Sequence, residues 1–260
     1  MIKDGRKLLS IEREKLILDL LDSGYTGITV LSDRIGVSEA TIRRDLLSLE
    51  ESGYVKRVHG GAIKLKNAET EPIFIEKAAR NYDAKEAIAN SALKLIENGD
   101  IIYLDGGSTI QILAKHLTEK KNLTIVTNSL MAALELFETD HRLIIVGGEF
   151  RRLSRTVVGS LTGKIISSLN IRKAFLGTIG FTLEKGMTTT DPNEAYTKEL
   201  VINNSEKVYV LADSSKVGHD SFAVSGKPEK IDALITDKGI DDKEFKRKLL
   251  EKDIELITPQ

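Results

Sequence analysis

"IIYLDGGSTIQILAKHL", residues 101–117, joins an apolar run to a helical pattern through a short polar loop. The apolar run stops at Asp105, two glycines and two hydroxyl residues follow, and apolar residues then recur at helical spacing. A glycine-rich loop that leads into a helix exposes backbone N–H groups, and the helix dipole favours an anion there. The stretch therefore predicts a strand, an anion-binding loop and a helix.

Similar apolar runs recur along the chain, and helical segments of about 10–15 residues lie between most of them. The candidate strands are residues 101–104, 123–126, 143–146, 173–176, 208–212 and 233–235. This alternation is typical of a mostly parallel α/β sheet.

Each candidate strand ends in a polar or glycine-rich loop, and in a parallel sheet all these loops meet at one edge, where ligands of open α/β sheets bind. Six loops follow the six candidate strands, and the last of them is residues 236–239. The first five loops contain the ligand-binding candidates Asp105, Gly106, Gly107, Ser108, Thr109, Thr127, Asn128, Ser129, Gly147, Gly148, Gly177, Thr178, Gly180, Asp213 and Lys216.

The chemistry of these loops suits a small phosphorylated polyol or sugar. Hydroxyl side chains and backbone N–H groups can donate to a phosphate, and Lys216 or Lys85 can add a cation. Asp105, Asn128, Glu194 and Asp213 can accept hydrogen bonds from sugar hydroxyls. For any single loop, a tight turn without a ligand remains the alternative.

Motifs for nucleotide binding and serine hydrolysis are missing. Residues 159–166, GSLTGKII, have three residues between the glycines where a P-loop has four, and Ile165 replaces the Ser or Thr that binds Mg²⁺. "GTIGFT" differs from GxGxxG, and no GxSxG motif exists. The sequence therefore gives no reason to expect a nucleotide cofactor.

The first 66 residues have a different texture, with short helical patterns and one hairpin. Apolar positions 28, 31 and 35 predict a helix that Gly36 ends, and Ser38 can cap the next helix. In that second helix, positions 42, 46 and 49 form a buried stripe. The opposite face carries small residues, hydroxyls and Arg44, a surface that fits the DNA major groove.

The segment "YVKRVHGGAIKL" (54–65) reads as a basic hairpin with a tight Gly-Gly turn, so the whole block predicts a winged helix-turn-helix. We expect the helix to read bases and the hairpin to lie along phosphates. A small helical domain that binds a protein is the alternative. The predicted DNA-binding residues are Ser38, Ala40, Thr41, Arg43, Arg44, Leu47, Ser48, Lys56, Arg57, His59, Gly60 and Gly61.

Composition sets limits on both predictions. Lys plus Arg total 38 and Asp plus Glu total 39, while residues 1–66 hold 12 basic and 10 acidic side chains, a net of only +2. The absence of cysteine excludes disulfides and thiolate chemistry, and the four scattered histidines give no metal-ligand spacing. Neither a signal peptide nor an apolar run of about 20 residues is present, so we expect a cytoplasmic protein without a membrane partner.

"SEATIRRDLLSLEESGYVKRVHGGA" (38–62) resembles the N-terminal signature of the DeoR family of bacterial transcriptional regulators. The matching parts are Ser38, the TIRRDL segment at 41–46, Arg57, and HGGA at 59–62. The resemblance implies that this block binds DNA in the manner of a repressor.

The remaining chain resembles the DeoR-type sensor domain, which is similar in fold to ribose-5-phosphate isomerase and CoA-transferase relatives. The matching segments are DAKEAIA with Lys85, LDGGST, VTNS, VGGE, GTIG, ADSSKVG, and DPNEAYTKE with Glu194 and Lys198. Ser108 stands where the family often has Thr, and it supplies the same hydroxyl. The resemblance implies a phosphorylated sugar-metabolism intermediate as effector and self-association as a homodimer or homotetramer.

We therefore expect an α/β chain with a winged helix-turn-helix domain at 1–66, a linker at 67–74 and a larger α/β sensor and oligomerisation domain at 75–260. The expected function is a non-enzymatic regulator, a repressor of sugar metabolism that binds operator DNA under control of a sugar phosphate. One alternative is a sugar-phosphate isomerase or transferase with an accessory DNA-binding domain, in which Asp105, Glu194, Asp213 and Lys216 would act on substrate. Another is a DNA-binding structural protein whose sensor domain has lost its ligand.

Overall fold

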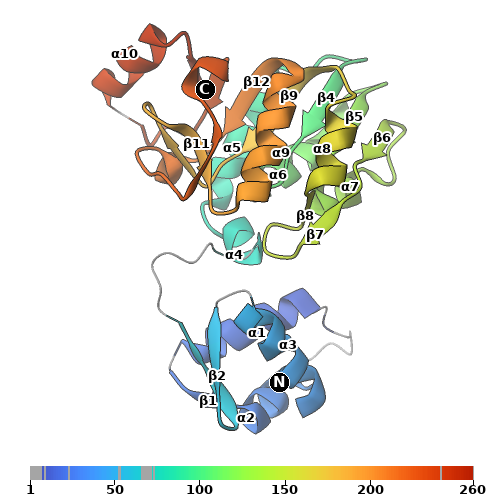
Figure 1. Ribbon diagram of the computed structural model, residues 1–260, viewed down its shortest axis with the longest axis vertical. Coiled ribbons are helices and arrows are strands. Elements are labelled where there is room, and N and C mark those ends of the chain that lie inside the picture. Colours follow the sequence, from blue (N-terminus) through green and yellow to red (C-terminus); the bar gives the residue numbers. More distant parts are fainter. Residues whose placement is uncertain are drawn as a thin grey trace. The chain divides into compact units, whose positions relative to one another are not determined.

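A computed structural model describes residues 8, 10–22, 24–51, 54–65, 72, 74–240 and 242–259. The chain divides into two compact units, Met1–Glu76 and Lys77–Gln260 (Figure 1). Most of the predicted linker, 67–74, lies outside the described residues. Its last residue, Phe74, already belongs to a helix.

The smaller unit has three helices and a small antiparallel sheet in its described part. Its elements are α1 (Ser10–Leu21), β1 (Thr26–Gly27), α2 (Ile28–Ile35), α3 (Glu39–Glu51), β2 (Val55–Val58) and β3 (Gly61–Lys64). The predicted helix at 28–35 is confirmed as α2. It ends at Gly36, whose φ of +76° is left-handed, a conformation that glycine adopts at no steric cost.

The predicted second helix, with its cap and its buried stripe, is confirmed as α3. The Ser38 hydroxyl accepts a hydrogen bond from the Thr41 amide at 3.3 Å and so caps the first turn. The predicted stripe, Ile42, Leu46 and Leu49, is at most 2% exposed. Its burial leaves the opposite face of α3 turned to solvent.

The predicted hairpin is present, but its turn lies one residue earlier than expected. In the β2–β3 ladder Val58 pairs with Gly61, so the turn consists of His59 and Gly60. Gly61 is already a strand residue, and a Cβ there would lie 2.3 Å from the carbonyl oxygen of Thr26. Close approach of β1 therefore explains the second glycine.

The larger unit contains one large parallel sheet with helices and two small sheets. Its elements are α4 (Phe74–Ala79, which begins in the smaller unit), α5 (Tyr82–Leu93), β4 (Ile101–Leu104), α6 (Ser108–His116), η1 (Leu117–Glu119), β5 (Thr124–Thr127), α7 (Leu130–Leu136), β6 (Arg142–Ile145), β7 (Glu149–Arg151), β8 (Thr156–Val158), α8 (Ser160–Ile166), β9 (Ile171–Gly177), β10 (Gly180–Thr182), β11 (Gly186–Thr189), α9 (Pro192–Asn203), β12 (Ser205–Leu211), η2 (Ser214–Lys216), β13 (Ala223–Gly226), η3 (Pro228–Lys230), β14 (Ala233–Ile235), α10 (Lys243–Glu251) and β15 (Glu255–Ile257).

The large sheet has seven strands in the order β15-β14-β12-β9-β4-β5-β6, and every neighbouring pair is parallel. All six predicted strands are confirmed, with ends that shift by up to three residues. The seventh, β15, was not predicted, because three residues beside charged neighbours carry no apolar run. The mixed α/β fold class is thereby confirmed.

Helices cover both faces of this sheet (Figure 1). One apolar core contains Ile88 of α5, Leu113 of α6 and Leu136 of α7. The other contains Ile166 of α8 and Val201 of α9, together with residues of α10. Two small antiparallel sheets, β10-β11-β13 and β7-β8, add to the second layer and were not predicted.

The strand order reverses at the centre of the sheet. From β4 the chain proceeds through β5 to β6 on one side, and from β9 through β12 and β14 to β15 on the other. The carboxyl ends of β4 and β9 therefore border the crevice in which open α/β sheets bind ligands.

Among the described residues, no helix has the length and apolar character needed to cross a bilayer.

One ion pair, which the pattern of apolar residues does not predict, joins two helices of the smaller unit. Arg13 of α1 donates to both carboxylate oxygens of Asp45 on α3, at 2.8 and 2.9 Å, and to the Leu8 carbonyl at 2.9 Å. The side chain of Asp45 is 4% exposed and that of Arg13 is 14% exposed. This pair fixes α3 against α1.

Replacing Asp45 with alanine should lower the free energy of unfolding of the smaller unit by about 3 kcal/mol, because it leaves a largely buried guanidinium without its partner. Urea unfolding followed by circular dichroism measures the change. Asp19→Ala, at an exposed position of α1, is the matched control and should change stability by less than about 0.5 kcal/mol. Equal effects of the two variants would contradict the structural role of the pair.

Candidate functional site

The predicted ligand loops lie along one edge of the large sheet. Because all seven strands are parallel, the loops that follow their carboxyl ends share that edge. The loops are 105–109 after β4, 127–129 after β5, 147–149 after β6, 177–180 after β9, 213–216 after β12 and 236–239 after β14. The edge is thus the first place to look for a binding site.

An ion pair at the strand-order reversal joins three of the predicted residues. Lys198 of α9 donates to the Asp105 carboxylate and, at 2.9 Å, to the Gly177 carbonyl. The Gly177 amide donates to the same carboxylate at 3.1 Å. Asp105 is 2% exposed and Lys198 is 7% exposed, so α9 is held directly over the ends of β4 and β9.

Burial raises the pKa of Asp105, and the ammonium of Lys198 partly offsets this effect. The nearby carboxylate of Glu194 also raises the pKa, which places both acids in one electrostatic neighbourhood. The pair has no net charge when ionised. Lys198 therefore serves first as the counter-ion of Asp105 and does not present a free cation to a ligand.

Glu194 has its own set of donors. Its carboxylate accepts from Arg151 at 3.1 Å, from Thr189 at 2.9 Å and from Thr156 at 3.4 Å. The Arg151 Nε also lies 3.4 Å from an oxygen of Asp191. The site thus contains a second cation that is already paired.

Sequence reasoning missed Arg151, Thr156 and Thr189 in this cluster. They come from β7, β8 and β11, short antiparallel strands that lie outside the predicted parallel pattern. The position of Glu194 four residues before Lys198, on one face of α9, is the signal that could have pointed to such partners.

The DGGST loop is pressed against this cluster. A Cβ on Gly106 would lie 2.1 Å from the Thr156 methyl group, so only glycine lets the loop approach β8 this closely. Gly107 has φ +134° and forms the N-cap of α6. Its left-handed backbone turns the first amides of α6 toward the sheet edge.

Ser108 and Thr109 open α6, and each is 7% exposed. Within the described part of the chain, neither hydroxyl takes part in a hydrogen bond. The first amides of an α-helix also have no partner inside the helix. Together these donors form a place where an anion could bind beside the Asp105–Lys198 pair.

Several predicted ligand residues use their polar groups inside the protein. Thr127 donates to the Leu104 carbonyl at 2.7 Å and accepts from the Ser129 amide at 3.0 Å. The Ser129 hydroxyl caps α7 by accepting from the Ala132 amide at 3.2 Å. Thr178 donates to the Gly180 carbonyl at 2.7 Å. These groups shape the loops.

Asn128 differs from its neighbours because one of its polar atoms is unused. Its amide nitrogen donates to the Val157 carbonyl at 3.1 Å. Its Oδ1 is buried and has no hydrogen-bond partner among the described residues. A buried orphan acceptor is costly, so this oxygen is the group in the 127–129 loop best placed to accept from a ligand hydroxyl.

The glycines after β6 have a packing role. A Cβ on Gly148 would lie 2.1 Å from the Thr162 hydroxyl, which donates to the Gly147 carbonyl at 2.8 Å. Gly180 is equally restricted, because a Cβ there would lie 2.5 Å from the His219 carbonyl oxygen. Close packing thus accounts for Gly148 and Gly180 without a ligand, whereas a Cβ on Gly147 would meet no atom within 4 Å.

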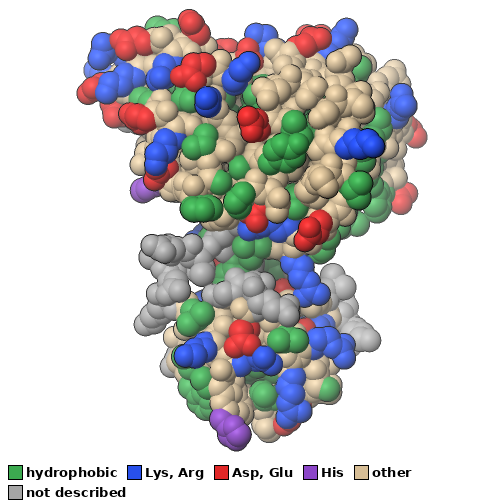
Figure 2. All heavy atoms as spheres, in the orientation of Figure 1, with side chains coloured by type: hydrophobic (Ala, Val, Ile, Leu, Met, Phe, Trp, Pro, Cys, Tyr) green, Lys and Arg blue, Asp and Glu red, His purple; other side chains and the backbone are tan. Residues whose placement is uncertain are grey.

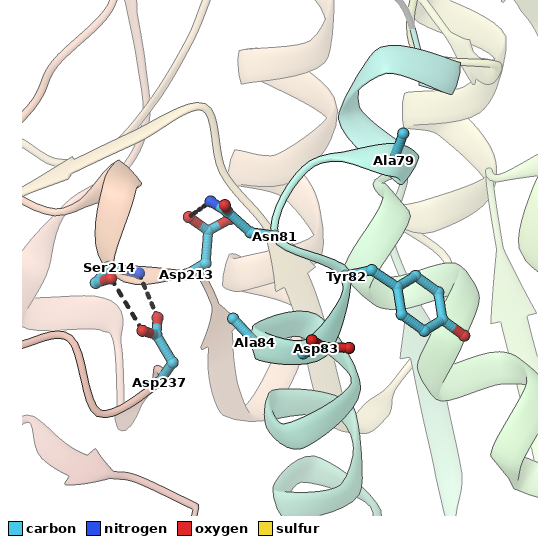
Figure 3. A pocket seen from close by; sticks show the side chains of 8 residues that line it. All are labelled: Ala79, Asn81, Tyr82, Asp83, Ala84, Asp213, Ser214 and Asp237. Atoms are coloured by element: carbon cyan, nitrogen blue, oxygen red, sulfur yellow. Dashed lines mark hydrogen bonds between the residues drawn. The ribbon is translucent and has the colours of Figure 1, made fainter.

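A cavity of about 470 Å³ lies at the ends of β12 and β14, and of its lining residues Asp213 is the one that was predicted to bind a ligand. Figure 3 shows Asn81 directed toward Asp213, with a hydrogen bond of 3.1 Å, and Ser214 directed toward Asp237. The cavity is lined by Ala79, Asn81, Tyr82, Asp83, Ala84, Asp213, Ser214 and Asp237.

Lys85 follows the cavity residue Ala84 in the chain and is only 4% exposed. Its ammonium donates to the carbonyls of Lys77 and Arg80, the latter at 2.5 Å. Burial lowers the pKa of Lys85 to about 8, with Asp213 opposing and Lys216 reinforcing the shift. The two predicted cations, Lys85 and Lys216, are therefore close enough to influence each other.

Most of the predicted DNA-binding surface of the smaller unit is exposed, but Gly61 is buried in β3. Ala40, Arg44 and Leu47 point to solvent from α3, and Leu47 is 41% exposed. Lys56 and His59 are exposed on the hairpin. Lys and Arg side chains are spread over the visible face of this unit (Figure 2).

Five predicted DNA-contact side chains have partners inside the unit, two of them being Ser38 and Thr41, whose hydroxyls lie 2.9 Å apart. Arg43 pairs with Glu39 at 2.8 Å and Ser48 donates to Glu14 at 3.2 Å. Arg57 pairs with Glu50 at 2.5 Å, and the Arg57 amide donates to the other oxygen of that carboxylate at 2.8 Å. Backbone and side-chain bonds to Arg57 lower the pKa of Glu50. Glu50 thus ties the end of α3 to the hairpin.

Family models match both units of the chain. The DeoR-like helix-turn-helix domain matches residues 13–68, and the DeoR C terminal sensor domain matches residues 80–238. The chain belongs to the DeoR family. It is therefore a transcriptional regulator with a helix-turn-helix domain and a sensor domain, as its sequence predicted.

Curated DeoR-type relatives match along most of the chain. The HTH-type transcriptional regulator GlpR of Haloferax volcanii is 36% identical over 90% of this chain and 92% of its own. GolR of Listeria innocua is 38% identical over 92% and 95%. The lactose phosphotransferase system repressor of Staphylococcus epidermidis is 37% identical over 86% and 89%.

Solved structures resemble the DeoR-family chain more weakly. Ribose 5-phosphate isomerase A of Methanocaldococcus jannaschii matches with a TM-score of 0.40 and 19% identity, over 53% of this chain and 55% of its own. A Pyrococcus horikoshii translation initiation factor eIF-2B matches with a TM-score of 0.44 and 14% identity, over 87% of each chain. The family assignment rests on the sequence matches.

Arg44→Ala should weaken binding to a mapped operator by about 1–3 kcal/mol and relax the base preference at one position, because Arg on the exposed face of α3 can pair with guanine.

Lys56→Ala should weaken binding to all DNA sequences alike and reduce the slope of log affinity against log salt concentration by about one. Fluorescence anisotropy over a salt series, with Lys15→Ala on α1 as the control, measures both. Unchanged binding by Arg44→Ala would show that α3 does not read the bases.

Lys85 should make stability depend on pH. Its folded pKa of about 8 lies below the unfolded value of about 10.4, so between these values the unfolded chain binds more protons. The free energy of unfolding should therefore rise with pH across this window and gain about 1.5 kcal/mol between pH 8 and 9.5 relative to Lys85→Met. Urea unfolding at the two pH values tests this, with exposed Lys94→Met as the control. Parallel pH profiles for wild type and Lys85→Met would contradict the shift.

Proposed function

We propose that this regulator is a repressor of sugar metabolism whose C-terminal domain binds a phosphorylated sugar at the carboxyl edge of the large sheet. The observation that carries the proposal is the meeting of unpaired donors with buried acids. The hydroxyls of Ser108 and Thr109 and the first amides of α6 lie beside Asp105. The donors suit a phosphate, and the carboxylates suit sugar hydroxyls.

The sugar part of the ligand has several acceptors within this edge. Asp105 and Glu194 belong to one electrostatic neighbourhood, and the Asn128 Oδ1 is a buried acceptor without a partner among the described residues. A polyhydroxylated ligand would give that oxygen a donor. Lys85, with a pKa of about 8, is protonated at neutral pH and adds positive charge near Asp213.

We favour a binding role over isomerase or transferase activity. A general base needs a carboxylate that is free to take a proton, whereas Asp105 is paired with Lys198 and Glu194 with Arg151. A DNA-binding domain on the same chain gives a ligand-driven conformational change a direct use. Several relatives carry the names of regulators or repressors, and the name of one refers to a lactose phosphotransferase system.

Control of operator binding requires the ligand to favour one arrangement of the DNA-binding domains. A coupling of 1–3 kcal/mol would change operator affinity by about 5–150-fold. We propose that ligand releases the repressor from its operator. We also propose that the regulator acts as a homodimer or homotetramer, because helix-turn-helix dimers bind paired half-sites about one DNA turn, or a multiple of it, apart.

Ser108→Ala combined with Thr109→Ala should abolish the ligand response and leave operator affinity intact, because it removes the phosphate donors without touching α3. The ligand is first found by a thermal-shift screen of phosphorylated sugars, with the unphosphorylated sugars as controls. A sugar phosphate that binds should raise the free energy of unfolding by about 2.7 kcal/mol when its concentration is one hundred times its Kd. Operator binding with and without that hit then measures the response.

The control variant is Thr118→Ala with Ser168→Ala, two exposed hydroxyls near helix C-termini. It should respond as wild type does. If no phosphate ester stabilises the protein or alters its operator affinity, the proposed effector class is wrong. Conversion of a hit into product during incubation would favour the enzyme alternative.

A further inference from the structure

The large sheet ends in an open strand. β6 is the last strand in the order and pairs only with β5 within the described part of the chain. The amides of Arg142 and Val146 donate into the sheet, to the carbonyls of Leu123 and Thr127, each at 2.9 Å. Because strand amides alternate in direction, the amides of residues 143 and 145 point outward from the sheet.

Large apolar side chains flank this open strand on both sides. Leu134 and Phe137, on and at the end of α7, are each 57% exposed. Ile145 on β6 is 42% exposed, and on α8 Leu161 is 66% and Ile165 is 36% exposed. We call these five residues, with β6, the β6-edge surface.

Figure 2 shows hydrophobic side chains, with charged side chains between them, on the side of the larger unit where Figure 1 places α7, α8 and β6. A nearby charge is turned away from this surface: the carboxylate of Glu135 on α7 accepts from Gln111 of α6 at 2.7 Å. Exposed charges also lie near β6, on Arg142 of the strand and Lys164 of α8. At the other end of the sheet, α10 packs beside β15 and supplies charged side chains, the protection that edge strands usually have.

The exposed area matches what an interface between two copies requires. Five large apolar residues that are about half exposed offer on the order of 100 Å² each. Two copies would then bury about 1,000 Å² from these residues alone, the lower bound for a specific interface. An open strand is also complementary to itself, since a twofold axis places two β6 strands antiparallel with outward amides facing outward carbonyls.

We propose that the β6-edge surface joins two copies of this chain into a symmetric dimer, with β6 paired to β6 and α7 and α8 packed around the contact. The inference deepens the proposed homo-oligomer by naming its surface. A second copy is the occupant that meets both requirements at once, because it brings an equal apolar area and an edge strand of matching length.

Two variants test the surface in the full-length chain by sedimentation velocity. Leu134→Lys with Leu161→Lys places charges on both flanks, and each substitution acts twice in a symmetric interface, so the dimer Kd should rise by about 10- to 100-fold. Ile145→Pro removes an outward amide that makes no bond within the sheet, and should block strand pairing while the monomer stays folded. Leu250→Lys, at a 75% exposed position of α10, is the control and should leave the dimer unchanged.

The outcomes separate the surface from the wider proposal. A wild-type chain that sediments as a 28.7 kDa monomer at micromolar concentration would overturn both the dimer and its surface. A wild-type dimer that survives the double lysine substitution unchanged would overturn the surface alone. If Ile145→Pro fails to fold by circular dichroism, the lysine variant decides. A thermal shift with sugar phosphate in the monomeric variant shows that the ligand site is intact independently of the interface.

Discussion

The parallel direction of the seven strands is the constraint on which the larger unit depends. It forces every connection to return along the sheet, in most cases through an α-helix, and brings all carboxyl ends to one edge. Residues as distant in sequence as Asp105 and Lys198 meet there because β4 and β9 are neighbours at the point where the strand order reverses. The site is therefore a consequence of topology, and its residues need no local motif to find one another.

The buried Asp105–Lys198 ion pair at this edge carries a desolvation cost. Burying Lys198 and Asp105, whose side chains are 9% and 3% exposed, loses hydration that their attraction recovers only with good geometry. The Gly177 backbone supplies that geometry by bonding to both partners. The result is a polar edge whose buried acids, Asp105 and Glu194, are each paired with a cation. A ligand anion could then accept hydrogen bonds from the first amides of α6 and from the hydroxyls of Ser108 and Thr109, which have no other partner in the described structure.

The sequence was sufficient wherever one periodicity controlled the structure. Apolar runs located six strands of the sheet, and the stripe of Ile42, Leu46 and Leu49 located helix α3. It failed where tertiary contact decided the outcome. Arg151 and Thr189 lie in short antiparallel strands without a recognisable pattern, and the hydroxyls of Thr127 and Ser129 bond to backbone that no local reading identifies. Lys198 was found only through family resemblance, because its role depends on a partner 93 residues away.

The two proposed surfaces of the larger unit are connected by one rigid element. Helix α7 begins at the cap formed by Ser129, in the loop that carries the unpaired Asn128 Oδ1, and ends beside Phe137 of the β6-edge surface. A ligand that gives Asn128 a donor acts on the loop from which α7 starts. Because a helix of two turns moves as a unit, a shift of that loop is carried to Leu134 and Phe137. Helix α7 thus belongs to both the proposed ligand site and the proposed dimer interface. A structural element that both sites contact is what coupling between ligand binding and dimer formation requires.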